Sequence, residues 1–280
     1  MMIVADSGST KTTWLDVESG NMVVTEGLNP HFSSDEQILE ACDIACRRFG
    51  GLQSTCSVYF YGAGCGQESQ RARVTSLLSN TFGTSDIHVE TDMLAACRAT
   101  AFGQSALVGI LGTGSNACLY DGRHIKYQST STGYILGDFG SANHVGRLLL
   151  NSYLTHHMPV HLRHMFHDLY DMSDAQLLDA VYHQPNPNRF LASLAPFATQ
   201  HSDDDYCRMV IEQTLEAWRI EVLMPLYSKV DLPLSIVGSY AKAVEPILRA
   251  VMETHGLQVR TVVANPIDGL RHFHSCSLQV

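Results

Sequence analysis

The sequence lacks several features that would assign it to a common functional class. No apolar run approaches the roughly 20 residues that a membrane-spanning helix needs. Acidic residues outnumber basic ones, 28 against 18, whereas nucleic-acid-binding proteins draw most of their affinity from a basic surface. A basic leader is also missing, because the chain enters strand-forming residues at once. We therefore expect a cytoplasmic protein with no membrane partner and no nucleic-acid partner.

The eight cysteines lack the C-x-x-C spacing of zinc and redox sites. Most of them lie in apolar periodic segments, which indicates reduced, buried thiols rather than a disulfide framework. Cys42 and Cys46 are one helical turn apart and could share a metal, but core packing is the favoured interpretation. His157, His161 and His164 share a helical face without a carboxylate to complete a metal site, so a solvated or interface helix is favoured there.

Strand and helix patterns alternate along the chain, which predicts an α/β fold with a mostly parallel inner sheet. In the first half we expect helices at about 36–49, 67–79 and 93–102, and strands at 57–61 and 87–91. In the second half we expect a loop at 134–139, strands at 234–237 and 259–263, and helices at about 141–156, 161–170, 174–182, 189–199, 203–227 and 241–255. We place the domain boundary near residues 103–105, which gives domains 1–103 and 104–280, with a helical insertion in the second.

The chain opens with a small-residue turn between two strands. Residues 3–14 read I-V-A-D-S-G-S-T-K-T-T-W, in which Asp6 ends an apolar strand and Ser7, Gly8, Ser9 and Thr10 form the turn before Lys11. Small residues let backbone N–H groups approach an anion closely, so this tip suits a phosphate. It is not a Walker loop, because the G-x-x-x-x-G-K-[ST] spacing is absent. An ordinary hairpin turn is the alternative interpretation.

A similar unit recurs about a hundred residues later. Residues 107–120 read L-V-G-I-L-G-T-G-S-N-A-C-L-Y, with Gly112, Thr113 and Gly114 in the turn between two strands. Each unit continues through a second turn into a third strand, at 22–25 and at 124–128. Two similar strand–turn–strand units indicate a duplicated architecture that holds one nucleotide between its halves.

These motifs carry a family resemblance. The chain resembles the superfamily of sugar kinases, actin and heat-shock chaperones, and within it the N-acetylglucosamine kinases and the related activator-type ATPases of hydroxyacyl-CoA dehydratases (the BadF/BadG/BcrA/BcrD type). The resemblance implies two ribonuclease-H-like domains with mixed sheets, the actin-like ATPase fold. It also implies ATP and Mg²⁺ as cofactors and a small-molecule amino sugar as the acceptor of the γ-phosphoryl group.

The resemblance implies a role for each motif. The backbone of residues 7–10 and Lys11 would hold the phosphates from one domain, and the turn at Gly112, Thr113 and Gly114 from the other. Asp6 would face the metal through water, since Mg²⁺ is bound by few carboxylates. Asp138, in G-D-F-G-S, would lie close to the metal or the sugar, with helix N-capping as its alternative. Gly238 and Ser239 resemble the adenosine turn.

The acceptor side is implied in the same way. Asp92, in T-D-M-L-A-A, follows a strand end and is the expected general base, with helix capping as its alternative. Asn29 would hold a sugar hydroxyl. Gly62 belongs to the small-residue turn beside the acceptor, where Cys65 replaces the usual acidic or polar residue. Loop residues Ser131, Thr132 and Gly133 would line the sugar pocket, but the family's tryptophan is missing there, and the G-A-x-x-G-A pattern of the closing helix is degraded.

Three function classes remain open at this stage. The leading one is an ATP-dependent sugar kinase acting on N-acetylglucosamine or a related amino sugar. An activator-type ATPase would need exposed cysteines to bind an iron–sulfur cluster. The acidic balance and the lack of a DNA-binding segment count against a non-catalytic sugar- and ATP-binding regulator. The acceptor sugar and the oligomeric state are open, with a homodimer among the expectations.

Overall fold

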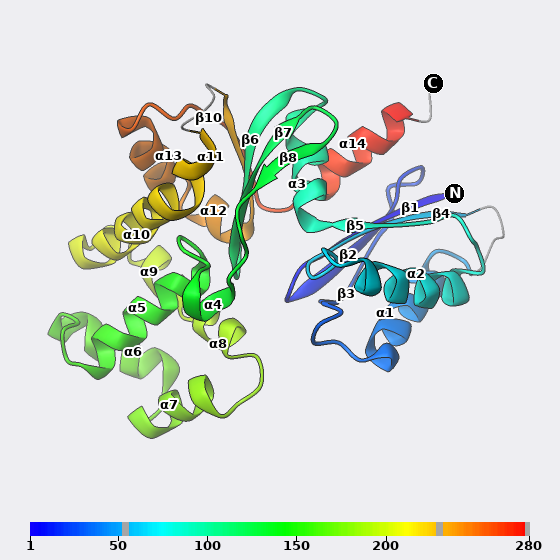
Figure 1. The fold of residues 1–280 in the computed structure, drawn as a ribbon. Helices are drawn as coiled ribbons and strands as arrows, with labels where there is room; N and C mark the ends of the chain where they lie inside the picture. Colours follow the sequence, from blue (N-terminus) through cyan, green and yellow to red (C-terminus); the bar gives the residue numbers. More distant parts are fainter. Residues whose placement is uncertain (52–55, 228–231, 278–280) are drawn as a thin grey trace. The chain divides into compact units, whose positions relative to one another are not determined.

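The protein divides into two compact units. A computed structural model describes residues 1–51, 56–227 and 232–277 (Figure 1). Unit 1 comprises Met1–Gln104 together with Asn265–Val280, and unit 2 comprises Ser105–Ala264. Each unit is built on one mixed five-stranded sheet, which confirms the predicted α/β fold with two domains.

The sheet of unit 1 has the strand order β3-β2-β1-β4-β5. These strands are β1 (Met2–Ser7), β2 (Lys11–Asp16), β3 (Met22–Glu26), β4 (Ser57–Gly62) and β5 (Ile87–Thr91). The first three form an antiparallel meander, and β1, β4 and β5 run parallel. The apolar side chains of the sheet divide between two clusters, one shared with α1 (Asp35–Arg48) and α2 (Glu68–Phe82), the other with α3 (Asp92–Ala101) and α14 (Ile267–Ser277).

Unit 2 repeats this topology. Its sheet has the order β10-β9-β6-β7-β8, with β6 (Ser105–Leu111), β7 (Ser115–Asp121) and β8 (Ile125–Gln128) as the meander and β9 (Leu234–Val237) and β10 (Val259–Val263) parallel to β6. The predicted duplication of the strand–turn–strand unit therefore holds at the level of strand order. Between β8 and β9 lies the helical insertion, whose helices share one large apolar cluster with the sheet.

The insertion and the last helices differ in detail from the sequence expectations. Their bounds are α4 (Gly133–Leu136), α5 (Ala142–Leu154), α6 (Val160–Tyr170), α7 (Asp174–Tyr182), α8 (Pro187–Ser193), α9 (Ala195–Gln200), α10 (Asp205–Trp218), the π-helix η1 (Arg219–Leu223), α11 (Met224–Tyr227), α12 (Ser239–Ala243) and α13 (Glu245–Thr254). The expected loop at 134–139 contains the short helix α4. The expected single helix at 241–255 is two helices, because Pro246 lacks the N–H that would continue α12 and instead occupies the first turn of α13.

The prediction that residues 104–280 form one domain is corrected for the last segment. Three contacts tie α14 to unit 1: the hydroxyl of Tyr61 lies 2.9 Å from Nε2 of His274, Arg271 donates to the carbonyl of Val17, and the backbone at Gly269 packs directly on Ala99. The chain therefore returns to its first sheet after β10. The boundary after Gln104 lies at the predicted position, and a second boundary, after Ala264, was not predicted.

Candidate functional site

The carboxyl ends of three parallel strands in unit 1 bring the predicted acidic residues together. In the register of the sheet, Ser7 pairs with Gly62, and Gly62 pairs with Thr91. Asp6, the last residue but one of β1, and Asp92, which directly follows β5, therefore lie at the same edge of the sheet, with β4 between their strands. This edge is where open α/β sheets bind their ligands.

Asp92 is free of the capping role that was its alternative. Thr91 is the N-cap of α3, and its side chain accepts a hydrogen bond from the N–H of Leu94 at 3.2 Å. The Asp92 carboxylate accepts from the N–H of Met93, and lies in the positive field of the helix N-terminus. Because Thr91 caps the helix, the carboxylate of Asp92 remains available for chemistry.

Asp6, Asp92 and Cys65 influence one another electrostatically. Burial, and then the charge of Asp92, raises the pKa of Asp6 to about 7, while Lys11 opposes the shift. Burial raises the pKa of Asp92, with the Met93 N–H opposing it, and burial followed by the Asp92 charge raises the pKa of Cys65 to about 12. Two half-buried carboxylates, of which Asp92 raises the pKa of Asp6 through its charge, attract a cation or a proton. Their oxygens are the ligand type that Mg²⁺ prefers.

The β1–β2 turn is fixed by backbone contacts. Within it the N–H of Gly8 donates to the carbonyl of Lys11 at 3.0 Å, and the N–H of Gly27 donates to the carbonyl of Thr10 at 3.1 Å. A side chain at Gly27 would lie only 2.5–2.6 Å from the backbone of Gly8 and Ser9, so the next loop packs tightly under the turn. Thr10 and Lys11 are exposed.

The hydroxyl of Ser7 has a structural task. It lies 2.7 Å from the Thr12 hydroxyl, donates to the carbonyl of Leu28 and accepts from the Leu28 N–H. Because Ser7 is fully buried, its contribution to a ligand would come from the turn that it braces rather than from its side chain.

The second turn lies in unit 2 and is braced by a carboxylate and an amide. Oδ1 of Asp138 accepts from the N–H of Ser115 at 3.1 Å, and its Oδ2 accepts from Nδ2 of Asn143 at 3.0 Å. The same Nδ2 donates to the carbonyl of Thr113 at 2.7 Å. A side chain at Gly114 would press on the Asp138 carboxylate at about 2.9 Å. Asp138 does not cap α5, because Ser141 is its N-cap. Each carboxylate oxygen can accept a further bond, so the metal or sugar role of Asp138 stays a prediction.

The Gly238–Ser239 turn adjoins the Gly112 turn. Gly238 has a φ of 145°, and a side chain there would collide with the carbonyl of Leu111, the residue that ends β6. Only glycine lets these two backbones touch. Unit 2 thus brings the predicted phosphate turn and the predicted adenosine turn to one sheet edge, with Ser239 exposed.

The loop of Ser131, Thr132 and Gly133 is exposed and leads into α4. The segment just before this loop is tied to β7, because Ser129 Oγ donates to Oδ1 of Asn116 at 2.6 Å. The guanidinium of Arg147 donates to the carbonyls of Tyr134 and Ile135 and so holds α4. The predicted sugar loop therefore lies in unit 2, while Asn29, Gly62 and Asp92 lie in unit 1.

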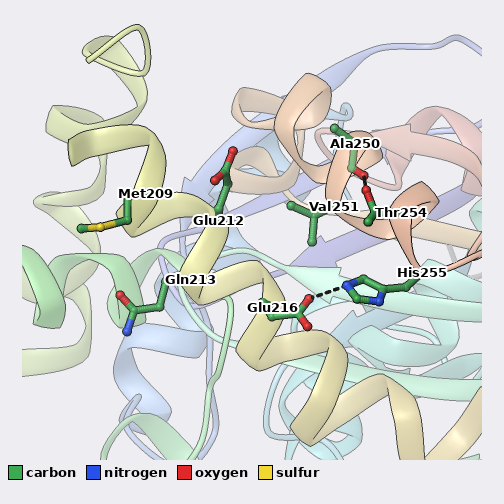
Figure 2. A pocket seen from close by; sticks show the side chains of 8 residues that line it. All are labelled: Met209, Glu212, Gln213, Glu216, Ala250, Val251, Thr254 and His255. Atoms are coloured by element: carbon green, nitrogen blue, oxygen red, sulfur yellow. Dashed lines mark hydrogen bonds and ion pairs between the residues drawn. The ribbon is translucent and has the colours of Figure 1, made fainter. Parts of the chain in front are cut away.

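A separate groove of about 490 Å³ lies on unit 2 between α10 and α13 (Figure 2). Its walls include Met209, Glu212 and Val251, and a contact of 3.2 Å between Glu216 and His255 crosses it. Arg219 also pairs with Glu216. None of the predicted site residues lines this groove. The glycine turn of each unit and the strand ends of unit 1, where Asp6 and Asp92 have raised pKa values, therefore remain the predicted site.

Neither a metal-binding cluster of side chains nor a membrane-spanning helix is found among the described residues. Within 1–51, 56–227 and 232–277, no group of three or more His, Cys, Asp or Glu side chains is arranged to hold a metal by itself. His161 instead lies 2.9 Å from Asp204 on α10. In the same described part of the chain, no helix is both long and apolar enough to cross a bilayer.

Solved structures identify the class. The chain matches the putative N-acetylglucosamine kinase of Porphyromonas gingivalis with 35% identity and a TM-score of 0.89 over 98% of both chains. The putative N-acetylglucosamine kinase of Chromobacterium violaceum shares the fold at 17% identity, with a TM-score of 0.76 over 97% of this chain and 98% of that one. A ROK-family glucokinase of Streptomyces griseus, solved with glucose and AMPPNP, also shares the fold at 14% identity and a TM-score of 0.54, covering 100% and 99% of the two chains. No family model and no curated protein matches the sequence.

The fold is the two-domain actin-like ATPase fold that the motifs implied. The chain belongs to the N-acetylglucosamine kinase family within it, which confirms the resemblance inferred from the phosphate turns.

Sequence reasoning missed several residues that build these turns. Asn143 holds the second turn, and Arg71 and Arg73 on α2 bind loop carbonyls near the predicted acceptor residues. Nothing in the sequence singles these residues out, because their partners lie up to 43 positions away.

Proposed function

We propose that the protein is an ATP-dependent kinase that transfers the γ-phosphoryl group to a hydroxyl of N-acetylglucosamine or a related amino sugar. The observation that carries this proposal is Asp92: a half-buried carboxylate with a raised pKa at a parallel strand end, uncommitted to capping and electrostatically coupled to a second carboxylate, Asp6. The 35% identity to a protein named as a putative N-acetylglucosamine kinase supports the choice of acceptor.

Asp92 is the general base in this proposal. The acceptor hydroxyl gives its proton to Asp92 as its oxygen bonds to the γ-phosphorus. The bond between that phosphorus and the β–γ bridging oxygen breaks, and ADP leaves with the bridging oxygen. Proximity and charge neutralisation supply most of the rate enhancement in phosphoryl transfer. The raised pKa of Asp92 makes it a better proton acceptor than an ordinary surface aspartate.

The two glycine turns share the work of holding ATP. Residues 7–11 of unit 1 and 112–114 of unit 2 offer backbone N–H groups to the phosphates, and Gly238 and Ser239 contact the adenosine. Asp6 would hold Mg²⁺, with Asp138 as the second candidate, and the ion would neutralise phosphate charge. On the acceptor side, Asn29 and the turn at Gly62 would orient the sugar, together with Ser131, Thr132 and Gly133.

The burial of the cysteines disfavours the activator-type alternative. Seven of the eight thiols are buried, and Cys276 is the exposed one. Ligation of a cluster needs several thiolates facing one site, and the raised pKa values of Cys42, Cys56, Cys65 and Cys207 keep these thiols protonated at neutral pH.

An acceptor screen tests the proposal. ADP release is measured with ATP and Mg²⁺ across N-acetylglucosamine, glucosamine, N-acetylmuramic acid, N-acetylmannosamine and glucose. We expect release that depends on an amino sugar and is strongest with N-acetylglucosamine. ADP release that is independent of every sugar would indicate an ATPase instead. ATP and sugar binding without ADP release would favour the regulator.

A further inference from the structure

Two arginines on one helix bind the two loops that carry the predicted acceptor residues. Arg73 of α2 donates to the carbonyl of Pro30 at 2.6 Å and to the carbonyl of Ser33 at 2.9 Å. Its Nε donates to the carboxylate of Asp35 at 2.7 Å, in the first turn of α1. One guanidinium thus fixes both ends of the 30–33 segment and anchors it to a helix.

Arg71 does the same for the neighbouring loop. Its Nη1 donates to the carbonyls of Cys65 and Gly66 at 3.1 and 3.0 Å. The carboxylate of Glu68, one turn earlier on α2, holds the guanidinium in place through bonds of 2.6 and 3.2 Å. The rigid, planar fork of arginine can serve two such acceptors at once, which a lysine ammonium cannot do with the same geometry.

The two loops also contact each other at Asn29. The backbone of Gly64, with a φ of 84°, lies so close to Oδ1 of Asn29 that any side chain at position 64 would collide with it. The same Oδ1 accepts from the N–H of His31 at 3.0 Å. The oxygen therefore already serves the loop with one of its two lone pairs, and the NH₂ group is the donor that the Asn29 amide can offer to a ligand.

We propose that Arg71 and Arg73 are positioning residues that set the acceptor subsite by fixing these two loops around Asn29. This inference rests on the proposed kinase function. The loop needs such support, since His31 and Phe32 are exposed and bury little surface of their own. Without the arginines, the backbone of residues 30–33 and 65–66 gains conformational freedom that must be lost again when the sugar binds.

The effect falls on the acceptor rather than on ATP. Arg73→Gln removes the fork while keeping a polar side chain of similar length. We expect the acceptor KM to rise on the order of 10-fold or more, because small displacements of binding groups are costly. The KM for ATP should change less than about 2-fold, because the arginines contact neither phosphate turn. Arg73→Lys should recover part of the loss, and Arg71→Gln should act in the same direction.

Two matched controls separate positioning from general stability. Asp35→Asn removes the ion pair with Arg73 but leaves the two carbonyl contacts, so the acceptor KM should stay within about 3-fold of wild type, as expected for a half-exposed pair. Arg47→Gln removes an arginine of α1 whose ion pair with Asp43 lies on the surface, and should leave both KM values unchanged.

Hydrogen exchange gives a readout that does not depend on turnover. In Arg73→Gln we expect faster exchange in the peptide spanning residues 28–34, where Phe32 and Ser33 donate to the Asn29 carbonyl, and unchanged exchange in β1 and β2. If the wild type phosphorylates no sugar, the proposed function fails, and the exchange result still decides whether Arg73 holds the loop. Unchanged exchange in 28–34 overturns the positioning role. Equal changes in the ATP and acceptor KM values would also overturn it, because they indicate a general structural defect.

Discussion

Asp92 is the residue on which the proposed phosphoryl transfer depends. Replacing Asp92 with Asn keeps the size and the position after β5 but removes the proton acceptor. We expect kcat to fall by about 10²–10⁴-fold, the usual contribution of a general base. Binding of a non-hydrolysable ATP analogue should stay within a few-fold of wild type, because the proposed phosphate contacts are backbone N–H groups that the substitution leaves in place. Steady-state kinetics and calorimetric titration measure the two quantities. A variant that retains most of its kcat would remove Asp92 from the mechanism.

Asp6 makes a different prediction, because its proposed partner is the metal. Asp6→Asn should lower activity at limiting Mg²⁺ and recover part of it when Mg²⁺ is raised, since a weaker site can be filled by mass action. The measurement is the dependence of kcat/KM on Mg²⁺ concentration in both proteins. Asp16→Asn serves as the control, because it changes a carboxylate at the opposite end of β2, where Asp16 accepts hydrogen bonds from Glu18 and Ser19. An unchanged Mg²⁺ dependence in Asp6→Asn would argue against a metal role.

At the scale of single residues, the sequence indicates the candidate site residues but not the contacts that hold them in place. Asp6, Asp92 and the glycine turns could be predicted because their spacing along the chain is itself the motif. The bracing groups could not, because Asn143 and Arg73 act through contacts with carbonyls 30 to 43 positions away. Ser7 differs in the opposite way: the sequence predicts a phosphate contact, but its hydroxyl bonds to Thr12 and to the backbone of Leu28 within the protein.

Among the elements, α14 makes a prediction about pH. His274 is buried, and its Nε2 lies 2.9 Å from the Tyr61 hydroxyl, to which Arg98 donates. Burial, followed by the charges of Arg98 and His88, lowers the pKa of His274 to about 4. In the unfolded chain His274 is therefore protonated as the pH falls below 6.5, whereas in the folded chain it is protonated only near pH 4. The stability that His274 contributes is full above pH 6.5 and is lost as the pH falls toward 4.

The measurement is the free energy of unfolding between pH 7 and pH 4 for wild type and His274→Gln. We expect wild type to lose on the order of 2–3 kcal/mol more than the variant across this range, from the size of the shift. His124→Gln, which changes an exposed histidine of unit 2, should follow wild type. Parallel pH profiles for wild type and His274→Gln would contradict the account of α14.

The elements themselves were predictable where local signals are strong. Ser173 and Gln176 form a capping box, and the helix that follows it was predicted at 174–182 and observed at Asp174–Tyr182. The π-helix η1 in the expected single helix at 203–227 was not predictable, because no local sequence signal distinguishes it. The placement of α14 in unit 1 depends on contacts made across more than 200 residues, such as that of Tyr61 with His274.

For the whole molecule, the proposal divides ATP binding between two units. If each unit contributes one turn to the phosphates and residues from both hold the sugar, each ligand should favour the same closed state. We expect N-acetylglucosamine to tighten binding of a non-hydrolysable ATP analogue, and the analogue to tighten sugar binding by the same factor. Calorimetry in both orders measures this factor, and solution scattering should show a smaller radius of gyration with both ligands. Independent binding and an unchanged radius would contradict a two-unit clamp.

The most direct test follows the γ-phosphoryl group itself. Wild type and Asp92→Asn are incubated with N-acetylglucosamine, Mg²⁺ and ATP labelled in the γ-phosphate, and the products are resolved by mass spectrometry. The account predicts labelled N-acetylglucosamine phosphate and ADP in equal amounts for wild type, with product formation reduced by about 10²-fold or more for Asp92→Asn. Label found only in inorganic phosphate, or equal product from both proteins, would contradict it.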